Sequence, residues 1–234
     1  MDFQDRRVVV TGGTGALGTA VLGALLKAGA KCEVPHRGAK TADASPYRND
    51  ARVTFTSIES LTAESVVSRY YAGLKDLWAS IHIAGGFESA SIEESDHALL
   101  TRQLDANLIT AYLCSRAATA ALRRFSAGGR IVNVAARQAL EPRLGAKSTA
   151  YTIAKAGVAA LTTSLAAELV KESILVNAVA PAALDTTVNR ASMPKADFSA
   201  WAGVEDVAAA ILFLASPENV VIRGAVVPVY GQAR

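Results

Sequence analysis

The feature that most constrains the fold is a glycine-rich turn directly after a short apolar run near the start of the chain. In VVVTGGTGALG, residues 8–18, β-branched residues precede Gly12, Gly15 and Gly18, and a helical pattern follows. Glycines at this spacing permit a tight turn, let backbone N–H groups approach a pyrophosphate and allow close packing of helix on strand. A strand, turn and helix of this kind predict the first unit of a dinucleotide-binding fold. Because glycine-rich turns also serve purely structural ends, the rest of the chain must support this interpretation.

Beyond this turn, short β-rich runs alternate with longer stretches of helical period. Two sets of apolar residues recur at the three- and four-residue spacing of a helix face. They are Leu104, Leu108, Ala111 and Tyr112, and Ala154, Val158, Leu161 and Leu165. This alternation predicts a doubly wound α/β Rossmann fold, with a seven-stranded parallel sheet, helices on both faces and one domain over residues 1–234. The strands are expected near residues 7–11, 31–35, 52–56, 77–83, 130–135, 174–179 and 225–229.

A tyrosine and a lysine stand four residues apart in TAYTIAKAG, residues 149–157. Positions i and i+4 share a helix face, so the Lys155 ammonium group can lie beside the Tyr151 phenol. At about 4 Å and an effective dielectric constant near 20, this attraction contributes roughly 4 kcal/mol, enough to lower a phenol pKa from about 10 to about 7. The pair therefore has the properties of a proton donor and its activator. The alternative is two polar residues on a helix surface.

The end of the second predicted strand indicates which dinucleotide is bound. An acid there would accept hydrogen bonds from the adenosine ribose, whereas a cation suits a 2′-phosphate. The strand ends in Pro35, His36 and Arg37 without an acid, so Arg37, with help from Lys40, predicts NADP(H) rather than NAD(H). Glu33, within the strand, is the feature that opposes this prediction. The alternative is that Arg37 opens a solvated loop.

Composition excludes several classes of protein. A chain of 234 residues that is 51% hydrophobic and 19% charged can bury a large core, which argues against disorder. The net charge is +3, and the basic residues are dispersed, so no nucleic-acid partner is expected. Two cysteines and three histidines complete no metal-ligand spacing, and no metal is expected. The widely separated Cys32 and Cys114 fit a reducing cytoplasm, where we expect the protein. Glycines and threonines interrupt the uncharged stretch at residues 8–26, which argues against a membrane span or a signal peptide.

Together these features resemble the short-chain dehydrogenase/reductase family over essentially the whole chain. The resemblance rests on the glycine turn, the Tyr151 and Lys155 pair, Asn107 in its helix, and VNAVAPAALDT after the sixth strand. It implies that Tyr151 is the general acid, that Lys155 lowers its pKa, and that Asn107 helps to hold a water molecule linking the lysine to solvent. It also implies a homodimer or homotetramer, packed through the helices that carry Asn107 and Tyr151. The implied cofactor-binding residues are Gly12, Thr14, Gly15, Ala16, Leu17, Gly18, Arg37, Ala84, Gly85, Pro181 and Thr186.

The chain departs from the family pattern at several positions. His82 and Ile83 replace two amides, Ala182 replaces a glycine, and the third strand ends in Ser57 and Ile58 rather than with an aspartate. Alignment along GRIVNVAA places Ala136 where the family has its catalytic serine. Gln138 lies thirteen residues before Tyr151, the usual serine-to-tyrosine separation, so a two-residue shift in the loop would give it the serine's role. We favour the ungapped alignment because strands shift register less easily than loops change length.

A narrower resemblance, to dihydropteridine reductase and its bacterial relatives, rests on GGTGALG, IAGGF, the alanine at position 136 and residues 184–201. The function expected is NAD(P)H-dependent reduction of a carbonyl or imine-like small molecule. The alternatives are a quinonoid dihydropteridine reductase and a catalytically silent dinucleotide sensor. A lid is expected over about residues 182–203. Phe87, Ala136, Gln138 and Trp201 are candidate substrate contacts, although Phe87 and Trp201 would serve equally well as packing residues.

Overall fold

A seven-stranded parallel sheet forms the centre of the molecule in the computed structural model, which describes residues 1–38, 42–125 and 128–232. The strand order is β3-β2-β1-β4-β5-β6-β9, and it reverses direction between β1 and β4. The seven predicted strands and the doubly wound fold are confirmed. The strands are β1 (Arg7–Thr11), β2 (Lys31–His36), β3 (Val53–Ser57), β4 (Leu77–His82), β5 (Gly129–Val134), β6 (Ile174–Pro181) and β9 (Val226–Val229).

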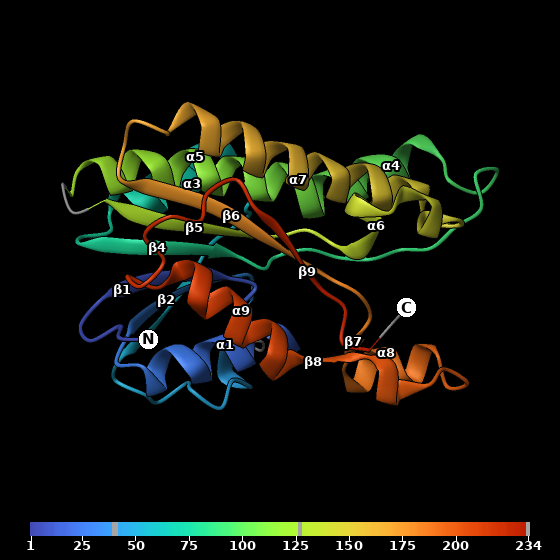
Figure 1. The fold of residues 1–234 in the computed structure, drawn as a ribbon, viewed down its shortest axis with the longest axis horizontal. Coiled ribbons are helices and arrows are strands. Elements are labelled where there is room, and N and C mark those ends of the chain that lie inside the picture. Colours follow the sequence, from blue (N-terminus) through green and yellow to red (C-terminus); the bar gives the residue numbers. More distant parts are fainter. Residues whose placement is uncertain (39–41, 126–127, 233–234) are drawn as a thin grey trace.

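Helices cover both faces of the sheet (Figure 1). One layer contains α3 (Glu64–Ala72), α5 (Thr110–Arg123) and α7 (Thr149–Glu168), and the other contains α1 (Ala16–Lys27) and α9 (Val204–Ala215). Successive residues of a strand point to opposite faces, so Val8 and Val10 pack with α1 and α9, while Val9 packs with α3 and α5. Burial on both sides explains why the strands near the centre have apolar runs instead of an alternating pattern.

The helix that carries Asn107 is not uniform. It begins as α4 (His97–Gln103), widens into the π-helical turn η1 (Leu104–Ile109) and continues as α5. Ala111 lies on its buried face as predicted, but Tyr112 is 51% exposed. Tyr112 continues the i, i+4 row of Leu104 and Leu108, which runs along a flank of the helix rather than over the sheet. The apolar period therefore overstated the width of the buried face.

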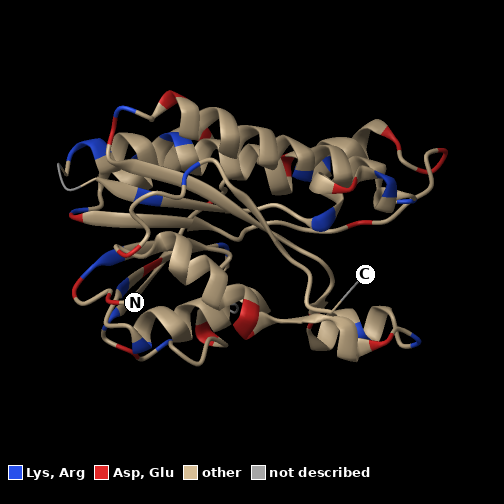
Figure 2. Cartoon of the chain, in the orientation of Figure 1, with Lys and Arg blue, Asp and Glu red and all other residues tan. Residues whose placement is uncertain are grey.

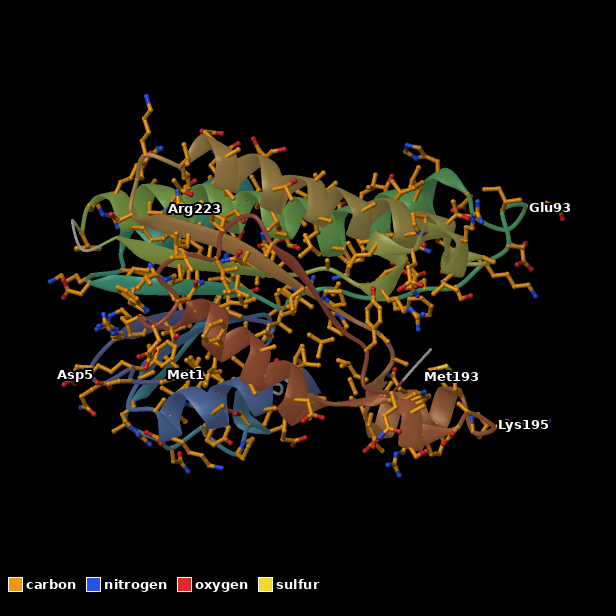
Figure 3. All side chains as sticks on the ribbon, in the orientation of Figure 1. Met1, Asp5, Glu93, Met193, Lys195 and Arg223 are labelled. Carbon is orange, nitrogen blue, oxygen red and sulfur yellow. The ribbon has the colours of Figure 1, made fainter. Side chains whose placement is uncertain are left out.

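The segment from residue 182 to residue 203, which we call the lid segment, folds outside the main sheet (Figure 1). Its two short strands, β7 (Leu184–Asp185) and β8 (Ala202–Gly203), pair in parallel. Between them lie α8 (Thr187–Ser192) and η3 (Phe198–Ala200). Figure 3 places Met193 and Lys195 of this segment at the edge of the molecule.

Charged residues of both signs are interspersed around the ends of the helices and strands (Figure 2). Among the described residues, no helix is both long enough and apolar enough to cross a membrane.

Candidate active site

A cleft of about 860 Å³ opens where the carboxyl ends of β1 and β4 meet, at the reversal of strand order. This is the position at which open α/β sheets bind their ligands. The glycine turn, the end of β2 and the segment after β4 all contribute to its walls. The predicted residues that line it are Gly12, Thr14, Gly15, Ala16, Leu17, Gly18, Arg37, Ala84, Gly85 and Phe87.

Two of the three glycines are required by close backbone contacts. Gly12 has a φ of +70°, and a Cβ atom there would lie 2.7 Å from the backbone nitrogen of Ala84. A Cβ atom at Gly18 would lie 2.1 Å from the carbonyl oxygen of Gly12. Gly15 meets no such obstacle, but it caps the N-terminus of α1 without a side-chain hydrogen bond. The first N–H groups of α1 therefore face the cleft without a side-chain cap, which suits a pyrophosphate.

Arg37 lines the cleft just beyond the end of β2, beside Ile58, and is exposed. The opposing acid, Glu33, is in register with Val9, points to the sheet face covered by α3 and forms an ion pair with Arg7. Glu33 lies within β2, four residues before Arg37, and does not line the cleft. Lys40 lies outside the described residues.

Tyr151 and Lys155 are neighbours on α7, and Lys155 and Asn107 lie beside Gly85. The Lys155 Nζ atom lies 5.8 Å from the centre of the Tyr151 ring and donates a hydrogen bond of 2.7 Å to the carbonyl oxygen of Val134. A Cβ atom at Gly85 would lie 2.6 Å from Asn107 Oδ1 and 3.6 Å from Lys155 Nζ. Gly85 thus brings the cleft next to Asn107 and Lys155, and Phe87, which also lines the cleft, contacts the Tyr151 ring.

Burial decides the pKa values of the pair. It raises the pKa of Tyr151 to about 12 and lowers the pKa of Lys155 to about 8. The expected lowering of the tyrosine pKa is therefore not seen in this geometry, because a weakly polar site disfavours phenolate and ammonium alike. Tyr151 consequently holds its proton at neutral pH, as a proton donor must.

Asn107 is held by the π-helical turn and by the segment after β4. Its Nδ2 group donates to the carbonyl oxygens of Gly86, at 2.9 Å, and Gln103, at 3.0 Å. Its Oδ1 atom accepts from the backbone N–H of Gly86 at 3.2 Å. Glu88 extends this arrangement by accepting hydrogen bonds from Arg102 and Gln103. Sequence reasoning missed these supports, since most of the contacts are to backbone atoms and leave no side-chain pattern.

The strand alignment that places Ala136 in the serine position agrees with the sheet. β5 pairs with β6 without a bulge from Gly129 to Val134, and Ala135 then bonds to the carbonyl oxygen of Val179. Ala136 is buried and immediately precedes α6 (Arg137–Leu140). Gln138 lies half-buried within α6, and no irregularity in β5 moves it back toward position 136.

The structure distinguishes the two aromatic candidates. Phe87 is 61% exposed and meets the Tyr151 ring edge-on, with ring centres 4.9 Å apart. Trp201 instead packs against Phe198, also at 4.9 Å, within the lid segment. Phe87 is therefore placed to contact a ligand beside Tyr151, whereas the Trp201 ring contributes to the packing of its own segment.

Pro181 and Thr186 do not line the cleft described above. Pro181 is buried as the last residue of β6, where the chain leaves the sheet for the lid segment. The Thr186 hydroxyl group accepts a hydrogen bond of 3.2 Å from Asn189 N and caps α8. That hydroxyl thus has a structural partner already.

His82, one of the departures from the family pattern, belongs to a buried chain of hydrogen bonds. Its Nδ1 atom lies 2.8 Å from Asn133 Oδ1, and its Nε2 atom lies 2.8 Å from the Ser80 hydroxyl group. Asn133 Nδ2 donates to Thr162 of α7, which orients the amide with its oxygen toward His82 Nδ1. That oxygen can therefore accept a hydrogen bond from the imidazole. This pattern fits a neutral imidazole, and burial lowers the pKa of His82 to about 4. The chain ties β4 and β5 to α7, next to the Val134 carbonyl that holds Lys155.

Comparison with known proteins gives consistent matches. A family model described as short chain dehydrogenase matches residues 6–197. Galactitol 2-dehydrogenase from Rhizobium johnstonii is 31% identical over 243 residues, covering 97% of this chain and 94% of the relative. A short-chain type dehydrogenase/reductase from Mycobacterium ulcerans has a TM-score of 0.89 at 26% identity, covering 99% of this chain and 90% of the other. The structure of ElxO with NADP bound has a TM-score of 0.87 at 23% identity, covering 97% and 98%.

Proposed function

The chain belongs to the short chain dehydrogenase family, and from this premise we propose that it reduces a carbonyl or imine-like small molecule with NADPH. The family makes the protein an oxidoreductase that uses a nicotinamide dinucleotide. The observation that carries the proposal is that the cleft reaches Lys155 and Asn107 at Gly85 and Tyr151 at Phe87. A ligand that extends along the cleft to Gly85 and Phe87 comes next to a protonated tyrosine.

Each part of the site has a role in this proposal. Gly12, Gly18 and the N-terminus of α1 accommodate the pyrophosphate, and Arg37 binds the 2′-phosphate. When bound, the cofactor supplies the hydride. Tyr151 donates its proton to the substrate oxygen or nitrogen, and the Lys155 ammonium group stabilises the phenolate that develops. Asn107 fixes the segment after β4 through Gly86 and holds the water that connects Lys155 to solvent.

Two further observations support the choice of cofactor and enzyme. Arg37 lines the cleft, whereas Glu33 is paired with Arg7 and does not line it, so the acid does not compete for the ribose. ElxO, whose fold this chain shares, binds NADP. The matches above give no support to the dihydropteridine reductase subgroup, and a silent sensor would have no need of a buried proton donor beside the cleft.

The test is NADPH oxidation with a panel of ketones, aldehydes, imines and quinones, followed by Tyr151→Phe with the best substrate. Removing the phenolic proton while keeping the ring should lower turnover by about two orders of magnitude and leave cofactor affinity within about twofold. Tyr112→Phe, on the exposed flank of α5, is the matched control and should retain full activity. Normal turnover by Tyr151→Phe would show that the tyrosine is structural.

A further inference from the structure

The loop after β5 is joined to the C-terminal segment by Arg137. The guanidinium group makes two hydrogen bonds to the Glu141 carboxylate, at 3.0 and 3.1 Å. Its central carbon lies 4.7 Å from the centre of the Tyr230 ring, in a cation–π arrangement. The Arg137 side chain is 15% exposed and that of Glu141 is 41% exposed, so solvent reaches the ion pair from the Glu141 side. The Tyr230 hydroxyl group also interacts with Glu141, which closes a cluster of three side chains.

Strand register shows where this cluster lies. Val134 of β5 pairs with Val179 of β6, and Pro181 of β6 pairs with Val229 of β9. β6 therefore separates the strand that precedes Arg137 from the strand that precedes Tyr230. To reach Tyr230, the Arg137 side chain spans the carboxyl end of β6, where the chain departs into the lid segment.

The two residues after Tyr230 contact the other end of the lid segment. A Cβ atom at Gly231, whose φ is +64°, would lie 2.8 Å from the backbone nitrogen of Ala202, so the two backbones are in tight contact. The backbone N–H of Gln232 donates a 3.1 Å hydrogen bond to the carbonyl oxygen of Ala200. We call residues 230–232 the strap. It connects the Arg137 cluster to the residues on either side of Trp201.

We propose that Arg137 is a positioning residue that, through the strap, sets the position of the lid segment relative to the site. Its guanidinium group holds Tyr230 at the carboxyl end of the sheet. The contacts of Gly231 with Ala202 and of Gln232 with Ala200 then fix the lid segment relative to Tyr230. The lid segment is also anchored by Ala202, which is buried in the core, and by Leu184, which packs against that core. Loss of the Arg137 contacts therefore loosens the strap and the neighbouring residues Ala200 and Trp201 while these anchors remain.

Tryptophan fluorescence tests this coupling without any substrate. Trp78 is 9% exposed and lies between Arg6 and Arg130, so quenching by acrylamide reports mainly on Trp201. Arg137→Met and Tyr230→Leu should each raise the quenching constant by about twofold, and the double variant should add little, because both changes break the same link. Arg143→Met, an exposed arginine of the same loop, is the matched control and should behave like the unmodified protein.

Kinetics provide the second readout, and this part alone depends on the proposed function. Arg137→Met should raise the KM of the carbonyl substrate by about tenfold, with a smaller change in kcat. NADPH affinity should be unchanged, because no residue from 182 to 203 lines the dinucleotide cleft. Arg137→Lys keeps the charge but loses the paired contact with Glu141. Its KM should therefore lie between those of Arg137→Met and the unmodified protein. Unchanged quenching in both Arg137→Met and Tyr230→Leu, or fully additive effects in the double variant, would overturn the proposal. Should Arg137→Met fail to fold, Tyr230→Leu alone decides through the same measurements.

Discussion

At the scale of single residues, Arg37 should determine cofactor preference. A charge-assisted contact with the 2′-phosphate contributes on the order of 1.5–3 kcal/mol, which corresponds to roughly ten- to a hundredfold in affinity. We expect the unmodified protein to bind NADPH more tightly than NADH by this factor, and Arg37→Asp to reverse the order. Titrating the unmodified protein and the variant with NADPH and with NADH measures the affinities to be compared. Equal affinities in the unmodified protein would exclude a role for Arg37 in this choice.

Lys155 should give the reaction a pH dependence near its own pKa. Burial lowers that pKa from 10.5 to about 8, so the ammonium form predominates below pH 8 and is lost above it. Because the ammonium group stabilises the developing phenolate, kcat/KM for NADPH in the reductive direction should decline as the pH rises through about 8. In Lys155→Arg the charge persists over this range, so the decline should disappear. A decline at the same pH in the arginine variant would assign it to another group.

At the scale of elements, the His82 hydrogen-bond chain should make the packing of β4 and β5 on α7 sensitive to acid. The pKa of His82 is about 4 in the folded protein against an ordinary value of 6.5, so the folded state favours the neutral imidazole. The resulting stabilisation is complete above about pH 6.5 and is lost as the pH falls from 6.5 to 4, amounting to about 3 kcal/mol.

Urea unfolding at a series of pH values measures this effect. His82→Asn removes the titrating group while leaving an amide that can bond to Asn133, so its free energy of unfolding should fall less steeply between pH 6.5 and 4. Carboxylates titrate in both proteins, and the difference between the two curves isolates the histidine. Identical curves would show that His82 does not titrate on unfolding in this range.

At the scale of the whole molecule, the outer surface of α5 and α7 should pair with a second copy of the chain. The two helices contact each other in one layer, where Tyr112 of α5 is 51% and Ile153 of α7 is 50% exposed. Large exposed apolar side chains on adjacent helices are typical of protein interfaces. We expect light scattering to report a homodimer or homotetramer, and Tyr112→Glu with Ile153→Glu to lower the mass. Ile92→Glu, equally apolar and 73% exposed but in a loop, should leave the assembly unchanged.

The sequence by itself determined where the seven strands lie along the chain, the glycine turn and the spacing of Tyr151 and Lys155. These features follow from local periodicity and fixed spacing. Only the tertiary structure decided what depends on contacts between distant segments. The ion pair with Arg7 holds Glu33 outside the cleft, and burial raises the pKa of Tyr151, against the prediction. The same holds for Arg137, whose partner Tyr230 lies 93 positions further along the chain and meets it because β5, β6 and β9 are neighbours in the sheet. Local pattern specifies elements and their faces, whereas desolvation and cross-sheet contacts exist only once those elements are packed.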